Sequence, residues 1–174
     1  MRVNRDLLLH TLRERLIPFL AGRGFDQISL SEEEQRSQEV RFSFPFGYMR
    51  RLKGTHFELL EIQLDKYGTA KFVLNFDTIP PQDVDVPWKH FEQSEARVSS
   101  LPEWYRLYSY RGCRKWISPS WNMLSYNESS RAAKAVDHAI ALFPEIENWF
   151  ATGDVGRHMR RVGYPISLQQ ASKK

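Results

Sequence analysis

Cysteine is nearly absent from this sequence. Among 174 residues only Cys113 carries a thiol. A single thiol cannot form an internal disulfide, and it excludes zinc sites that are built on paired thiolates. The lone cysteine also fits a reducing compartment, where disulfides are rare.

Long hydrophobic runs are missing as well. No stretch approaches the roughly 18 consecutive apolar residues that a membrane span requires. The apolar run Leu7–Leu9 near the N-terminus is followed closely by Arg13, Glu14 and Arg15, which is not the pattern of a secretory signal. We therefore expect a cytoplasmic protein that has no membrane partner.

The sequence also has no clear motif for catalysis or for cofactor binding. Gly22-Arg23-Gly24 lacks the lysine of a phosphate-binding loop and follows an expected helix, so it indicates a helix stop. His56 and Glu58 are two positions apart and share a strand face, but no second histidine is near, so an exposed polar face of a sheet is expected.

Cys113 is the remaining candidate for chemistry. It lies between Arg111 and Arg114, and neighbouring cations make a thiol more nucleophilic. A cysteine nucleophile also needs a positioned histidine. His90 and His138 are available, but the sequence places neither of them beside Cys113. We therefore predict no catalytic residue, no metal ligand and no cofactor.

The charge is distributed unevenly along the chain. Residues 1–156 carry 20 basic and 21 acidic side chains, whereas residues 157–174 carry five basic side chains and no acidic one. The length and the 41% hydrophobic content are those of one globular domain. We predict a single domain over residues 1–152 and a polar basic tail over residues 153–174.

Hydrophobic periodicity predicts an α+β fold. Apolar residues recur at helical spacing over residues 4–21 and 128–143, with a further helical turn after Pro144. Alternating apolar residues predict a hairpin over Phe57–Asp77, with its turn at Tyr67-Gly68. Strands made by hairpins form antiparallel sheets, so the sequence predicts an antiparallel sheet of about four strands with the N- and C-terminal helices packed on one face.

Three further segments carry weaker patterns. Val40–Phe46 alternates apolar and polar residues and predicts a half-buried strand, as does Trp104–Tyr110. Trp88–Arg97 has room for a short helix. The basic residues Arg50, Arg51 and Lys53 precede Gly54 and indicate an exposed loop between strands.

Several of these segments resemble a known family. Phe19–Phe25 contains a helix exit with glycine and phenylalanine, Leu60–Gln63 and Lys71–Phe76 form the hairpin arms, and Trp116–Trp121 carries two tryptophans. Over roughly residues 5–125 the chain resembles the domain-of-unknown-function family 4304 of bacterial proteins. The resemblance implies a bacterial protein of this fold and brings no established activity with it.

An aromatic stretch between Trp88 and Tyr126 is the strongest candidate for a binding site. It contains four of the five tryptophans, and basic residues interleave with its rings. The candidate residues are Trp104, Tyr108, Tyr110, Arg111, Arg114, Lys115 and Trp116. The alternative is that most of these rings belong to the core, with only their polar tips at the surface.

Three functions remain open at this stage. Tryptophan, tyrosine and arginine are enriched where proteins bind one another, so the first hypothesis is a protein-interaction module whose partner is another protein. Some small bacterial domains of this general kind are immunity proteins that block a toxin, which makes an immunity-like role one form of this hypothesis. The alternatives are a nucleic-acid-binding protein that uses the same stretch and the basic tail, and an enzyme whose site is not recognised.

Overall fold

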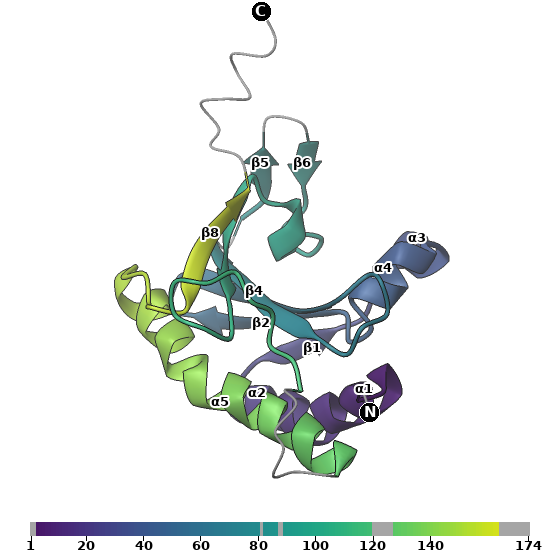
Figure 1. Ribbon diagram of the computed structural model, residues 1–174. Coiled ribbons are helices and arrows are strands. Elements are labelled where there is room, and N and C mark those ends of the chain that lie inside the picture. The colour runs from purple at the N-terminus through teal and green to yellow at the C-terminus, as the bar shows by residue number, and fades with distance from the viewer. Residues whose placement is uncertain (1–2, 81, 87–88, 120–126, 164–174) are drawn as a thin grey trace, which may run out of the picture.

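A six-stranded antiparallel sheet forms one layer of the structure, and two helical segments form the other (Figure 1). The computed structural model describes residues 3–80, 82–86, 89–119 and 127–163. The sheet has the order β1-β2-β3-β4-β7-β8. Its strands are β1 (Asp26–Ile28), β2 (Tyr48–Lys53), β3 (His56–Leu64), β4 (Phe72–Ile79), β7 (Glu103–Leu107) and β8 (Met159–Gly163). The predicted α+β class and antiparallel sheet are confirmed, and the sheet has six strands where about four were expected.

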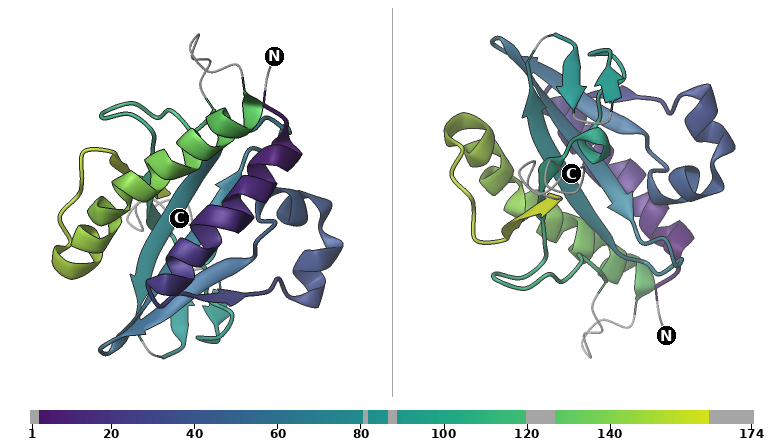
Figure 2. Two further views of the ribbon diagram at one scale, coloured as in Figure 1. Left: turned by 90° about the horizontal axis from the view of Figure 1, so that it is seen from below. Right: turned by 90° about the horizontal axis from the view of Figure 1, so that it is seen from above.

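The helical layer consists of an N-terminal helical segment and one long C-terminal helix. Figure 2 shows them side by side across one face of the sheet, as predicted. Their bounds are α1 (Arg5–Thr11), η1 (Leu12–Leu16), α2 (Ile17–Gly22) and α5 (Glu128–Thr152). Asn4 caps α1 by accepting from the Asp6 amide at 2.9 Å, and Gly153 ends α5 in the left-handed conformation. None of the described helices has both the length and the apolar character needed to cross a membrane.

Prolines shape both helical segments. Pro18 has no amide hydrogen to donate to the preceding turn, and that turn, η1, has π-helical geometry. α5 continues through Pro144 without a break. The helix predicted over residues 128–143 and the turn expected after it therefore form one continuous helix.

The core lies between the sheet and these helices. Alternate residues of β3 and β4 point toward the helical layer, as the period of two requires. Fully buried members of this core include Leu60, Ile62, Leu64, Phe72, Leu74 and Phe76 from the sheet, and Leu8, Leu12, Leu16, Leu20 and Phe143 from the helices. The hairpin predicted over Phe57–Asp77 is therefore confirmed. In it β3 and β4 pair in antiparallel fashion, with Phe57 opposite Ile79 at one end and Leu64 opposite Phe72 at the other.

The predicted strand over Val40–Phe46 is wrong. The segment Gln38–Ser43 is a helix, α4, which follows the short helix α3 (Glu32–Arg36). The hydroxyl of Ser37 accepts from the Val40 amide at 3.3 Å and caps α4. This local cap fixes a helical start that the alternating aromatic residues obscured.

Two other segments also differ from expectation. The predicted loop at Arg50, Arg51 and Lys53 is part of β2. The segment proposed as a helix over Trp88–Arg97 instead contains β6 (Lys89–Phe91), which pairs with β5 (Val84–Val86) in a separate hairpin. A short 3₁₀ turn, η2 (Val98–Ser100), follows, and Trp88 lies outside the described residues.

The expected tail is partly a strand. Met159–Gly163 forms β8, which pairs with β7. Glu103 lies opposite Gly163 at one end of this pairing, and Leu107 lies opposite Met159 at the other. Residues 164–174 lie outside the described residues. Part of the basic segment thus belongs to the sheet, at the edge opposite β1.

Gly47, just before β2, occupies a position that only glycine fits. Its φ is +68°, and an added Cβ would lie 2.1 Å from the carbonyl oxygen of Ile28 in β1. Replacing Gly47 by alanine should lower the free energy of unfolding by about 2 kcal/mol, because the backbone strain and the clash add. Gly54→Ala is the control: its φ is +59° but nothing lies within 4 Å, so about 1 kcal/mol is expected. Urea denaturation compares the two, and equal losses would refute the role of the contact.

Candidate functional site

The four aromatic rings predicted to bind a partner are mostly covered. Tyr108 is buried, and Trp104 is half-buried against an apolar cluster that includes Leu59 and Leu101. Trp116 is half-buried beside two cations: the Lys71 ammonium lies 5.5 Å and the Arg106 guanidinium 5.8 Å from its ring centroid. Only Tyr110, which is 51% exposed, presents most of its ring to solvent.

The three predicted cations of this stretch are exposed. Arg111, Arg114 and Lys115 project from the loop that follows β7. The Lys115 ammonium lies 4.8 Å from the centroid of the Tyr110 ring, within the range of a cation–π contact. Of the seven candidate residues, these three and Tyr110 therefore form the accessible part.

The loop meets the basic segment that was expected to be a tail. The Gly112 amide donates to the Arg157 carbonyl at 3.3 Å, and the Tyr108 amide donates to the His158 carbonyl at 2.8 Å. The Arg160 guanidinium donates to the Gly112 carbonyl. These contacts bring together two groups of cations that are far apart in the sequence.

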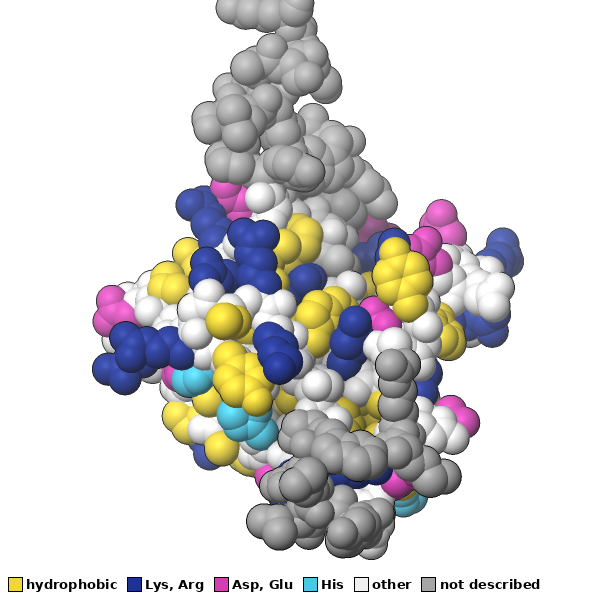
Figure 3. Space-filling model, in the orientation of Figure 1, with side chains coloured by type: hydrophobic (Ala, Val, Ile, Leu, Met, Phe, Trp, Pro, Cys, Tyr) yellow, Lys and Arg dark blue, Asp and Glu magenta, His cyan; other side chains and the backbone are white. Residues whose placement is uncertain are grey.

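Strand pairing adds one more cation to this group. Arg106 of β7 lies directly opposite Arg160 of β8, so both side chains point to the sheet face that the helices leave open. We call the combined set the basic surface, and Figure 3 shows lysine and arginine side chains gathered over this part of the molecule. Its members are Arg106, Arg111, Arg114, Lys115, Arg157 and Arg160.

None of these six cations forms an ion pair with a carboxylate of the described residues. Arg106 donates to neutral groups instead: its Nε lies 2.7 Å from Asn75 Oδ1 and its Nη2 lies 2.7 Å from Gln63 Oε1. Like charges directly opposite one another in a sheet are destabilising. The Arg106–Arg160 pair therefore leaves concentrated positive charge available for an anionic group.

Sequence reasoning found half of this surface. Arg111, Arg114 and Lys115 were singled out, whereas Arg157 and Arg160 were assigned to a tail. No local signal places Arg160 in a strand, because Met159–Gly163 joins the sheet only through pairing with β7.

The titratable groups that could have formed an enzyme site do not converge. Glu58 lies 3.8 Å from His56 on the helix-covered face of β3, and Glu61 points to the opposite face. His90 contacts Asp85 at 2.7 Å in the β5–β6 hairpin, and Cys113 is exposed in the loop after β7. Within the described ranges, no three histidine, cysteine, aspartate or glutamate residues are grouped so as to hold a metal ion.

Comparisons with known proteins add no assignment to this geometry. No protein-family model matches the chain, and no curated protein sequence or solved structure matches it. The resemblance to family 4304 stays a prediction.

Proposed function

We propose that this protein is a binding module whose basic surface recognises a nucleic acid. The observation that supports the proposal is the meeting of the loop at Gly112 with Arg157 and Arg160, which unites six cations without carboxylate partners among the described residues. Phosphate neutralisation by such side chains supplies most of the affinity of proteins for nucleic acids. Arginine, which makes up five of the six, also binds phosphate in a bidentate way.

The composition of the surface favours a nucleic acid over a protein partner. Protein–protein interfaces have an apolar core that is depleted in charge, whereas interfaces with nucleic acids are far more positively charged. Here Tyr110 is the one exposed ring among the four candidate aromatics, and the Lys115 ammonium lies 4.8 Å from its centroid. An exposed tyrosine beside cations suits stacking on a base of a single strand.

The proposal predicts salt-dependent binding. Fluorescence anisotropy with labelled single-stranded RNA, single-stranded DNA and duplex DNA should show saturable binding at about 50 mM salt and much weaker binding at about 200 mM. If about five phosphates are contacted, the slope of log K against log salt should be about −3 to −4 for a single strand. Arg111→Glu with Arg114→Glu should weaken binding at low salt by more than about tenfold and flatten the slope by at least about 1.

A matched control distinguishes this surface from net charge alone. Arg36→Glu with Arg41→Glu changes the charge equally on α3 and α4, where both side chains are exposed and form no ion pair with a described residue. This variant should change the affinity less than about threefold, since screening limits the reach of exposed charges to about 10 Å. Equal losses in the two variants would contradict the assignment.

An acidic protein is the alternative partner for the basic surface. Polyglutamate titrated at the same salt tests whether the surface binds carboxylates rather than phosphates. Tighter binding to polyglutamate than to every oligonucleotide would reject the nucleic-acid proposal in favour of an acidic protein partner. Absence of binding to any of these polyanions at low salt would reject both.

A further inference from the structure

A second site lies on the open face of the sheet, near the edge opposite the basic surface. A cavity of about 210 Å³, partly open to solvent, is lined by residues of β2 and β3, of the segment 28–34 and of the segment 94–98. Its walls are apolar at Leu59 and Val98 and polar at Tyr48 and Glu61.

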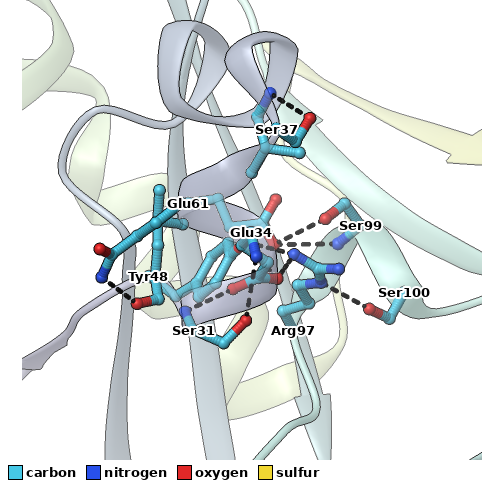
Figure 4. A network of polar contacts seen from close by, with 11 residues as sticks. Ser31, Glu34, Ser37, Tyr48, Glu61, Arg97, Ser99 and Ser100 are labelled. Carbon is cyan, nitrogen blue, oxygen red and sulfur yellow. Dashed lines mark hydrogen bonds and ion pairs between the residues drawn. The ribbon is translucent and has the colours of Figure 1, made fainter.

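Glu61 is the unusual member of this cavity. Its side chain is fully buried, and its Oε1 accepts from the Ser99 amide at 3.0 Å and the Ser99 hydroxyl at 3.1 Å (Figure 4). Its other oxygen, Oε2, is buried and has no hydrogen-bond partner among the described residues. The Asn75 side chain, at the paired position of β4, lies near Glu61, and its amide group donates to Gln63 Oε1 at 3.0 Å. A buried acceptor without a donor is costly, and such a group in a cavity wall indicates a ligand that donates to it.

The other polar groups of the cavity already have partners. Tyr48 donates to Glu34 Oε1 at 2.9 Å, and Arg97 contacts both Glu34 and the Tyr48 hydroxyl (Figure 4). Arg97 Nε also donates to Ser100 Oγ at 2.9 Å. Arg50 lies over the Phe57 ring, with its guanidinium 5.4 Å from the ring centroid. Arg97 therefore offers no unoccupied anion site, and Arg50 is the one lining cation that is not paired with a carboxylate among the described residues.

The charge of the lining favours a cation. Four carboxyl groups, from Glu33, Glu34, Glu61 and Glu95, face two guanidinium groups, from Arg50 and Arg97. Because Glu34 pairs with Arg97, the carboxyl groups of Glu33, Glu61 and Glu95 remain, and they outnumber the one remaining cation, Arg50. A positively charged donor would both satisfy Glu61 Oε2 and balance this excess.

We propose that this cavity binds a small organic cation, a primary ammonium or guanidinium group on a short aliphatic body, with Glu61 Oε2 accepting from the charged group. The apolar walls would cover the aliphatic part, and Ser99 holds the carboxyl group in place through Oε1. This site is distinct from the basic surface: it lies over β2 and β3, whereas the basic surface lies on β7, β8 and the loop after β7, and Arg106 is the member of that surface whose charge reaches Glu61.

Binding should couple to the protonation of Glu61. Burial raises the pKa of Glu61 to about 7. Contacts with Ser99 and Asn75 and the charge of the Arg106 guanidinium lower this pKa, but their effect is smaller than that of burial. The Tyr48 hydroxyl also faces Glu61, and burial raises its pKa, so that it stays neutral. A cation prefers the ionised carboxylate, so its affinity should rise with pH until Glu61 is ionised and then level off.

The test is a titration of the protein with butylammonium and with butylguanidinium. Calorimetry measures the binding, and NMR monitors the amide resonances of Ser99 and Tyr48 during the titration. Saturable binding with a dissociation constant on the order of 1 mM or tighter is expected for so small a ligand. Butan-1-ol and butyrate, which are neutral and anionic, should bind at least about tenfold more weakly, given the cost of leaving Oε2 without a donor. Binding of the alcohol as tight as that of the cations would overturn the proposal.

Two variants locate the binding. Glu61→Gln keeps an acceptor for Ser99 but removes the charge, and it should weaken butylammonium at least about tenfold at pH 8 and abolish the pH dependence. Glu92→Gln removes an exposed carboxyl group that lies outside the lining and should change the affinity less than about threefold. Equal effects of the two variants, or no saturable shift at Ser99 in the wild-type protein, would refute the site. If Glu61→Gln does not fold, the change in the Ser99 amide resonance and the pH dependence of the affinity in the wild-type protein still decide the question.

Discussion

Replacing Arg51 by methionine should lower the free energy of unfolding by about 3–5 kcal/mol, the usual cost of removing one partner from a buried ion pair. Arg51 lies on the helix-covered face of β2 and is 8% exposed. Its guanidinium contacts Glu58 of β3, and it binds Glu147 of α5 in a bidentate way at 3.0 and 2.6 Å. Glu58 is only 2% exposed, so the variant would leave its carboxylate buried without that cation.

Other contacts of Arg51 tie the two layers together. Its Nη1 donates to the Arg23 carbonyl, at the end of α2, at 2.8 Å. Its guanidinium also lies 4.4 Å from the centroid of the Phe25 ring. The side chain thus joins two strands, the long C-terminal helix and the end of the N-terminal helical segment.

Urea denaturation at pH 7 measures this loss. Arg50→Met is the matched control, because Arg50 lies next to Arg51 on the opposite face and is only partly buried; a loss below about 1 kcal/mol is expected there. Adding Glu58→Gln to Arg51→Met should recover part of the stability, since it removes the uncompensated charge. A loss below about 1 kcal/mol in Arg51→Met would show that the three charges contribute little.

Stability should fall as the pH rises toward neutrality, and Glu61 should be a main cause. Burial raises its pKa from 4.5 to about 7, so in this interval the folded protein holds a proton that the unfolded chain has released. The contribution of Glu61 is therefore fully present below about pH 4.5 and is lost as the pH rises through 7. At about 1.4 kcal/mol for each pH unit, the loss is about 3 kcal/mol.

Glu61→Gln isolates this contribution. The difference in unfolding free energy between this variant and the wild type should grow from pH 4.5 to 7, in favour of the variant, and stay constant at higher pH. Burial also raises the pKa of Asp77 to about 7, so Asp77→Asn should show the same sign. Glu95→Gln, at an exposed position, should leave the profile unchanged. Parallel profiles for Glu61→Gln and the wild type would contradict the argument.

The sequence by itself determined the elements whose signals are local. Apolar residues at helical spacing and the end signals at Asn4 and Gly153 specified both helical segments, because each signal acts within one or two turns. Strict alternation around Tyr67-Gly68 specified the β3–β4 hairpin for the same reason. From these the α+β class followed, with the helices on one face.

Tertiary structure decided whatever depends on pairing between distant segments. β1 has only three residues, and Met159–Gly163 in β8 does not alternate apolar and polar residues. β8 is a strand because β7 lies beside it. Arg51 and Glu58 look like surface residues in the sequence, and it is the packing of α5 and of the segment at the end of α2 over them that buries their charges. Likewise, the pairing of Arg106 with Arg160 created the basic surface, and Ser99 covering β3 made Glu61 a buried acid. Local periodicity reports which face a side chain takes, whereas its burial, its charge partners and its ligand depend on which distant segment packs against that face.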